Sequence, residues 1–73
     1  MLWTDGVHLV SDTSLDELHE FAARIGLKRE WYQKGHYDMT APWRIRRALK
    51  AGAKLTGPRV IARMRRELLE GSP

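Results

Sequence analysis

The sequence predicts an α+β fold, in which a small sheet of three or four strands packs with three helices. Apolar residues recur at three- and four-residue steps in three stretches of the chain, which is the spacing of amphipathic helices. Short runs between these stretches are rich in β-branched and aromatic residues, which favour strands. At 73 residues, the whole chain (1–73) is predicted to form a single domain.

The first predicted elements are a strand and a helix. The apolar run at residues 7–10 suits a strand, which can begin as early as Leu2 or Trp3. Ser14 and Glu17 fit a capping box, in which each side chain bonds the backbone N–H of the other residue, so a helix is predicted to begin there. Gly26 is predicted to end it in the left-handed conformation. One face of this helix carries Leu15, Leu18, Ala22 and Ile25, with Phe21 beside it.

The middle of the chain reads as two strands followed by a helix. Residues 29–33 and 36–39 are predicted to be strands joined by a turn at Lys34 and Gly35. Thr40 is the expected N-cap of the next helix, which runs to about residue 51.

The last elements are a short strand and a third helix. Residues 53–55 suit a short edge strand, and Pro58 suits the first turn of the helix. The apolar stripe of that helix consists of Val60, Ile61, Met64 and Leu68.

Composition excludes several classes of protein. With no cysteine, the chain has neither disulfides nor thiolate metal sites. Its apolar runs are too short to span a bilayer, and no basic segment typical of a secretory leader opens it, so we expect a cytoplasmic protein that does not bind membranes. The net charge of +4 is uneven: residues 1–43 sum to −3 and residues 44–73 to +7. The basic part is expected to be attracted to polyanions or to an acidic protein surface.

A catalytic or metal site has one weak candidate. His36 and Asp38 are two residues apart, so in a strand they point to the same face, where His8 or His19 could join them to hold a metal ion or move a proton. We favour a structural role for both, and predict no cofactor, no metal site and no enzymatic activity. No phosphate-binding glycine loop or nucleophile motif is present, and capping explains the hydroxyls of Ser11, Thr13 and Ser14.

A binding role requires fewer specific residues than a catalytic role does. A core this small hides about two of the five Trp and Tyr side chains, so some must reach the surface. Trp43 beside Arg44 is the preferred contact point. For nucleic acid or an acidic surface, the predicted contacts are Trp43, Arg44, Arg46, Arg47, Arg59, Arg63 and Arg66. For a protein partner, which an added strand would suit, they are Trp3, Val7, His8, Leu9 and Val10. A helix-turn-helix is disfavoured because residues 52–58 are longer than its usual turn.

Several strings resemble a small bacterial and phage family known as domain of unknown function 4031. They are His8 to Thr13, Leu15 to Leu27, Trp31 to Gln33, His36 to Asp38 and Ala48 to Ala53. The resemblance covers about residues 8–69 and implies a shared fold without an activity. Family members begin with a further hydrophobic strand ending in paired aspartates, which this chain is expected to lack.

A short, basic, cysteine-free chain of this kind also resembles the small transcription regulators of lytic phages. That resemblance implies a protein that binds the host RNA polymerase in the host cytoplasm, inhibits initiation and promotes antitermination, with RNA or DNA nearby in the complex. The alternative hypothesis is a basic, free-standing nucleic-acid-binding protein, and the third is a metal hydrolase using His36 and Asp38.

Overall fold

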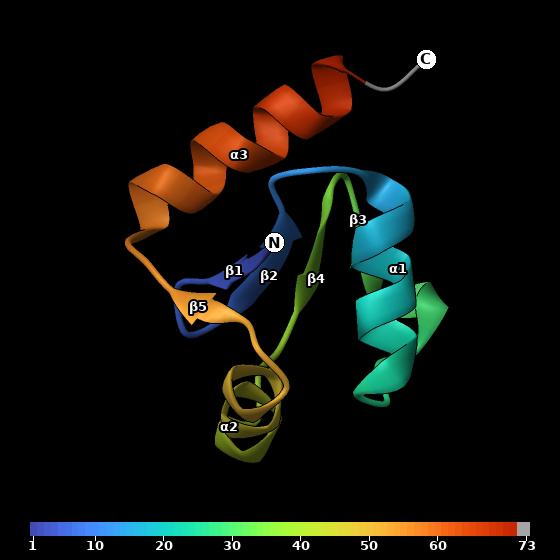
Figure 1. The fold of residues 1–73 in the computed structure, drawn as a ribbon, viewed down its shortest axis with the longest axis vertical. Coiled ribbons are helices and arrows are strands. Elements are labelled where there is room, and N and C mark those ends of the chain that lie inside the picture. The colour runs from blue at the N-terminus through green and yellow to red at the C-terminus, as the bar shows by residue number, and fades with distance from the viewer. Residues whose placement is uncertain (72–73) are drawn as a thin grey trace.

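The computed structural model describes residues 1–71, and the molecule measures 32 × 24 × 18 Å along its principal axes (Figure 1). In chain order the elements are β1 (Leu2–Thr4), β2 (His8–Ser11), α1 (Leu15–Arg24), a 3₁₀ helix (Arg29–Trp31), β3 (Tyr32–Gln33), β4 (His36–Asp38), α2 (Pro42–Lys50), β5 (Lys54–Leu55) and α3 (Pro58–Glu70). The predicted α+β class with three helices is confirmed. The sheet has five strands rather than three or four. Within these residues, no helix combines the length and the apolar character that crossing a lipid bilayer demands.

The strand order across the sheet is β3-β4-β2-β1-β5. Neighbours are antiparallel except β1 and β5, which run parallel. The register places His8 opposite Asp38 and Leu9 opposite Tyr37. Strand β2 is therefore the centre of the sheet, hydrogen-bonded on both sides.

The first predicted strand is in fact a hairpin of two strands. The carboxylate of Asp5 accepts hydrogen bonds from the backbone N–H groups of Val7 (2.9 Å) and His8 (2.8 Å), which turns the chain between β1 and β2. Gly6 has a φ of +99° in this turn. An Asp side chain that bonds backbone two and three residues on is a recognised turn former.

Helix α1 forms largely as predicted. The Ser14 hydroxyl accepts from the Glu17 N–H at 3.0 Å, and Gly26 has a φ of +86°, with Leu27 N–H bonded to the Ala22 carbonyl at 2.8 Å. The second half of the capping box is wrong: Ser14 N–H donates instead to the Ser11 hydroxyl at 3.2 Å. The Glu17 carboxylate instead accepts a hydrogen bond from that same Ser11 hydroxyl.

The two later helices begin without a side-chain cap. The N-cap of α2 is Ala41, so the prediction of Thr40 for that role is wrong. Proline at the first position of both helices supplies the favourable φ and removes one N–H that would lack a partner.

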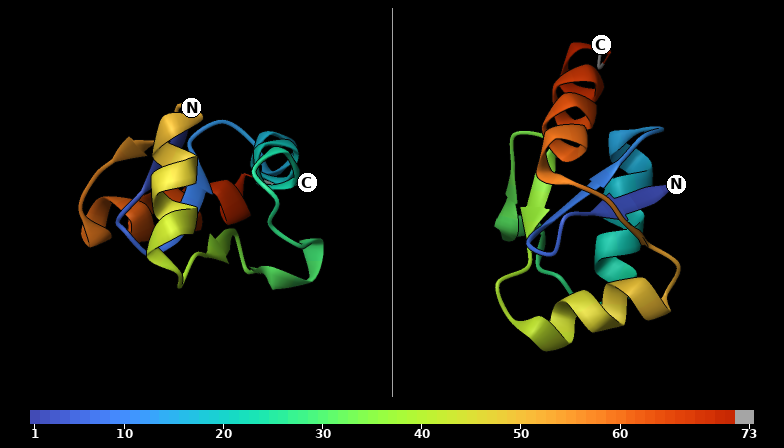
Figure 2. Two further views of the ribbon diagram at one scale, coloured as in Figure 1. Left: turned by 90° about the horizontal axis from the view of Figure 1, so that it is seen from below. Right: turned by 90° about the vertical axis from the view of Figure 1, so that its left-hand side faces the viewer.

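The main core lies between one face of the sheet and helices α1 and α2. Its buried residues are Leu2, Leu9, Leu18, Phe21, Ala22, Ile25, Leu27, Tyr37, Met39, Ala48 and Ala53. On the other face, Val10 is buried and α3 packs against β2 with Ile61 buried. Helices α2 and α3 lie at opposite ends of the molecule with the sheet between them (Figures 1 and 2).

The turn that joins β3 to β4 lies against α3. Gly35 has a φ of +90° and is buried, and a methyl group added to it would come within 2.9 Å of Arg65 Cγ and 3.1 Å of Leu69 Cγ. Only glycine provides both this backbone conformation and this close approach.

Candidate functional site

The residues predicted to meet a protein partner are only partly available. Leu9 and Val10 are 0% exposed, and β2 is paired on both sides, so no partner strand can be added along it. Because β1 and β4 pair with the two sides of β2, the open edges of the described sheet are β3 and β5, and a contact between a partner and residues 7–10 stays a prediction. Val7 is exposed, His8 is half-buried, and the Trp3 indole donates to Asp12 at 2.9 Å, which holds the pKa of Asp12 below its usual range.

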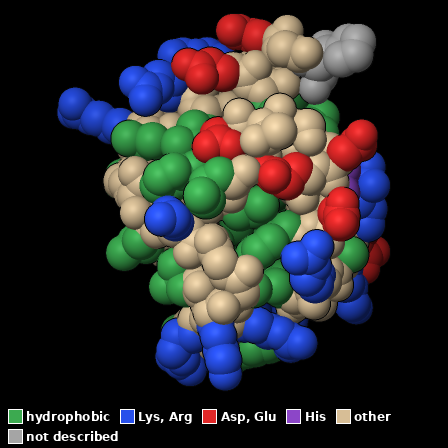
Figure 3. All heavy atoms as spheres, viewed as in Figure 1, with side chains coloured by type: hydrophobic (Ala, Val, Ile, Leu, Met, Phe, Trp, Pro, Cys, Tyr) green, Lys and Arg blue, Asp and Glu red, His purple; other side chains and the backbone are tan. Residues whose placement is uncertain are grey.

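The predicted arginines do not form one surface. Arg44, Arg46 and Arg47 lie on α2, whereas Arg59, Arg63 and Arg66 lie on α3, at the other end of the molecule. Figure 3 shows Lys and Arg side chains at both ends of the molecule, and Asp and Glu side chains both in the middle and at the upper end. Each helix therefore forms a separate basic area, and the molecule does not have one acidic and one basic end.

Next to α2, aromatic and cationic side chains stack. The Arg44 guanidinium lies 4.3 Å from the ring centroid of Trp43 and 4.6 Å from that of Trp31, so it contacts both indoles. Lys28 Nζ lies 5.7 Å from the same Trp31 ring. These four residues are called the α2 patch below. Trp43 remains 46% exposed, which leaves nearly half of one large aromatic surface open to a partner.

A second group of polar side chains gathers where β2 meets β4. His8, opposite Asp38 in the register, places Nε2 at 3.6 Å from Asp38 Oδ1. His36 Nε2 lies 3.3 Å from the same oxygen. These three residues are called the histidine cluster, and each has a possible ligand atom within 4.8 Å of those of the other two. The prediction that His36 and Asp38 share one face of a strand is confirmed.

Asp5 orients His8 within this cluster. Asp5 Oδ2 lies 2.9 Å from His8 Nδ1, while Oδ1 accepts the two backbone N–H groups of the β1–β2 turn. The side chain is only 7% exposed. Burial alone would raise the pKa of Asp5, but hydrogen bonds from His8 and Val7 outweigh burial and leave the pKa below its ordinary value. The carboxylate is therefore ionised at neutral pH, and it directs Nε2 of His8 toward His36 and Asp38.

The other two histidines differ in environment. The His36 side chain is 9% exposed and its Nδ1 is buried. Burial lowers the pKa of His36, and the negative charge of Asp38 opposes that effect. His19, the other residue considered as a third member, instead bonds the Tyr37 hydroxyl at 2.7 Å and packs against Tyr32. His19 is therefore outside the cluster.

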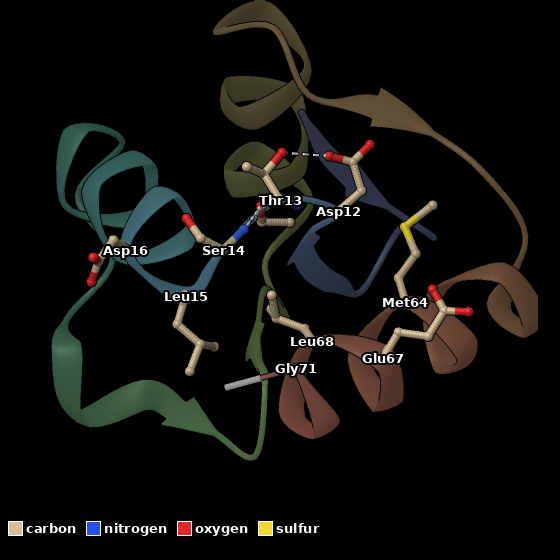
Figure 4. Close-up of a pocket in the computed structure, with 10 residues that line it drawn as sticks. Asp12, Thr13, Ser14, Leu15, Asp16, Met64, Glu67, Leu68 and Gly71 are labelled. Atoms are coloured by element: carbon tan, nitrogen blue, oxygen red, sulfur yellow. Dashed lines mark hydrogen bonds between the residues drawn. The ribbon is translucent and has the colours of Figure 1, made fainter. Parts of the chain in front are cut away.

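A groove of about 490 Å³ lies between the β2–α1 turn and α3 (Figure 4). Its apolar wall includes Leu15, Met64 and Leu68. Its hydroxyls serve the turn: the Ser11 hydroxyl accepts the N–H groups of Thr13 and Ser14 and donates to Glu17. The prediction that capping explains these hydroxyls is confirmed for Ser11 and Ser14.

Sequence reasoning missed Asp5, Lys28 and the stacking role of Trp31. The Asp5-Gly6 pair was a readable signal, because Asp-Gly commonly forms a hairpin turn and Asp side chains bond nearby backbone. No local signal identifies Trp31 or Lys28, since their contact with Arg44 depends on how distant segments pack.

Comparison with known proteins gives a family and no closer relative. A family model described as "Protein of unknown function (DUF4031)" matches residues 1–68. The match begins at the first residue, so it includes β1, which the resemblance over residues 8–69 had left out. No curated protein and no solved structure matches the chain.

Proposed function

The chain belongs to the DUF4031 family, and on that premise we propose that it is a non-enzymatic binding protein that docks on a larger partner through the α2 patch. The observation that carries this proposal is the half-exposed Trp43 indole stacked on Arg44. Tryptophan and arginine are the side chains most enriched among the residues that dominate binding energy at protein interfaces.

The stack reduces the cost of binding. Arg44 contacts two indoles, so its long side chain is ordered before any partner arrives, and less conformational entropy is lost on association. Trp43 lies on the outside of this stack and presents apolar area that a partner can cover. Truncating it is therefore expected to remove a large share of the binding energy.

Charge selects an acidic partner. Helix α2 carries Arg44, Arg46, Arg47 and Lys50 and has no acidic residue. Lys28 adds a fifth positive charge beside Trp31. An acidic protein surface would be attracted to this end of the molecule, whereas a basic surface would be repelled by its like charge.

The specific partner we propose is bacterial RNA polymerase, in the cytoplasm of the host cell. Binding there would inhibit initiation and promote antitermination. The polymerase is the partner that the resemblance to small phage transcription regulators implies, and the α2 patch adds a surface of suitable chemistry for an acidic region of such an enzyme.

The second candidate is direct binding of single-stranded nucleic acid. An exposed aromatic beside guanidinium groups is the arrangement on which bases stack, and Trp43 with Arg44 provides it. The two functions differ in salt dependence, because binding to phosphates releases counterions and weakens steeply as salt rises.

The test is a binding titration of purified bacterial RNA polymerase, and separately of single-stranded RNA, at low salt and at about 0.5 M salt, where the Debye length is about 4–5 Å. Polymerase binding that persists at high salt supports the first function, and RNA binding that disappears there supports the second.

Two matched double variants identify the surface. Trp43→Ala with Arg46→Ala should weaken binding about 30-fold or more, since losing a dominant interface side chain costs about 2 kcal/mol or more. Leu55→Ala with Arg59→Ala removes the same kinds of exposed side chain away from α2 and should change binding by less than about threefold. Equal losses in both variants, or no binding to either partner, would refute the proposal.

A further inference from the structure

We propose that the histidine cluster is a binding site for one divalent transition-metal ion of the zinc class, held by Nε2 of His8, Nε2 of His36 and a carboxylate oxygen of Asp38. This site is separate from the α2 patch and does not depend on the proposed docking function. Two imidazoles and one carboxylate are a donor set that zinc accepts, whereas magnesium and calcium prefer oxygen ligands alone.

The spacing of the donor atoms fits such an ion. Ligand bonds of about 2.0–2.1 Å in tetrahedral geometry place the ligand atoms about 3.3 Å from one another. The measured separations from Asp38 Oδ1 are 3.3 Å to His36 Nε2 and 3.6 Å to His8 Nε2. Each of the three residues has a possible ligand atom within 4.8 Å of those of the other two, so an ion between them requires only small side-chain adjustments.

The backbone fixes the three side chains before an ion arrives. His8 and Asp38 are directly opposed on adjacent strands, and His36 is two residues before Asp38 on the same face. The Met39 N–H donates to the Val7 carbonyl at 2.6 Å, which closes the pairing of β2 with β4 next to the cluster. The neighbouring pair, Leu9 and Tyr37, is fully buried in the main core on the opposite face. The sheet therefore holds the donors in place.

Asp5 provides the outer support that histidine ligands in metal sites usually have. A ligating histidine generally donates its second ring N–H to a carboxylate or carbonyl, which fixes its tautomer and orientation. His8 Nδ1 lies 2.9 Å from the buried Asp5 carboxylate, so the proton is placed on Nδ1 and the lone pair of Nε2 is free for the ion. Asp5 is therefore a positioning residue for this site.

The site has one side open to solvent. The side chains of His8 and Asp38 are 37% and 38% exposed, whereas His36 lies beneath them at 9%. Three protein ligands leave a fourth position of a tetrahedral ion, which water would occupy. The exposed rim also gives the ion a path into the site.

The test is a Zn²⁺ titration of the full chain after removal of metal with a chelator, followed by calorimetry and by the ring signals of the three histidines in NMR spectra. Wild type should bind one Zn²⁺ per chain, with shifts of the His8 and His36 ring signals and little change at His19. Zinc should also raise the melting temperature, because the ion binds the folded form.

Variants separate this site from adventitious binding by histidines. His8→Gln and Asp38→Asn alter half-exposed ligands and should weaken Zn²⁺ binding at least tenfold while circular dichroism stays unchanged. Asp5→Asn should weaken it about 10- to 100-fold, as loss of an outer carboxylate does elsewhere. His19→Gln is the matched control, because it removes an imidazole outside the cluster, and it should bind as wild type does. The proposal is overturned if wild type takes up no stoichiometric zinc, or if His19→Gln loses as much affinity as His8→Gln.

Discussion

Replacing Gly35 by alanine tests how α3 is attached to the sheet. At a φ of +90°, any L-residue with a Cβ is strained by about 1–2 kcal/mol. The added methyl would also lie 2.9 Å from Arg65 Cγ, 3.1 Å from Leu69 Cγ and 3.3 Å from the Arg65 carbonyl oxygen. Relieving such contacts by shifting packed groups costs about a further 1–3 kcal/mol. The expected loss of stability for Gly35→Ala is therefore about 2–5 kcal/mol.

Gly52 provides the matched control for this experiment. Its φ is +116°, so alanine is strained there as well, but no atom lies within 4 Å of the added methyl. Gly52→Ala should therefore lose only the strain energy of about 1–2 kcal/mol. Urea and thermal unfolding of both variants measure the difference, and each kcal/mol corresponds to about 4–8 °C in melting temperature for a domain of this size. Equal destabilisation of the two variants would show that α3 does not press on the β3–β4 turn.

Three further predictions concern the core, a cap and pH. Leu18→Ala should destabilise the domain by about 2–5 kcal/mol in urea unfolding, since Leu18 is 0% exposed in the main core, and a near-neutral effect would contradict that packing. Ser14→Ala should lower stability by about 1 kcal/mol, whereas Thr40→Ala, which removes no cap, should stay within about 0.5 kcal/mol. Burial, followed by the charge of Arg29, lowers the pKa of His19 below 6.5, so the unfolded chain takes up the proton first as pH falls. The contribution of His19 to the free energy of unfolding should therefore be fully present well above pH 6.5 and should be lost as pH falls toward the lower pKa of the folded state. In chelator-treated protein, His19→Gln should reduce this pH dependence of stability.

The parts of the fold that local chemistry determines were predictable from the sequence. Helix α1 has a Ser14 cap, an apolar stripe and a terminating Gly26 within a few turns of chain, and all three act as expected. Helix α2 shows the opposite case, because Ala41 at its N-cap offers no side-chain signal and the nearby Thr40 misled the prediction.

The site depended on contacts that no local pattern encodes. The spacing of His36 and Asp38 predicted a shared face, but either His8 or His19 could have joined them. Only the pairing of β2 with β4 decides that question in favour of His8, while α1 directs His19 to Tyr37.

The arginines show the same dependence on long-range structure. Arg44 and Arg59 belong to helices separated by only a few residues, yet these helices lie at opposite ends of the molecule (Figure 1). The reason is β5, which pairs in parallel with β1 and carries the chain along the edge of the sheet before α3 begins.

The outermost strands, β3 and β5, are only two residues long each. An incoming chain that tried to extend the sheet at either border would find too few free backbone groups to form a lasting ladder, and Lys54 would add charge at the β5 border. Concentrated solutions of the domain should accordingly resist fibril growth. Any self-association should depend on net charge and salt concentration, and not on pairing between the edge strands of two molecules.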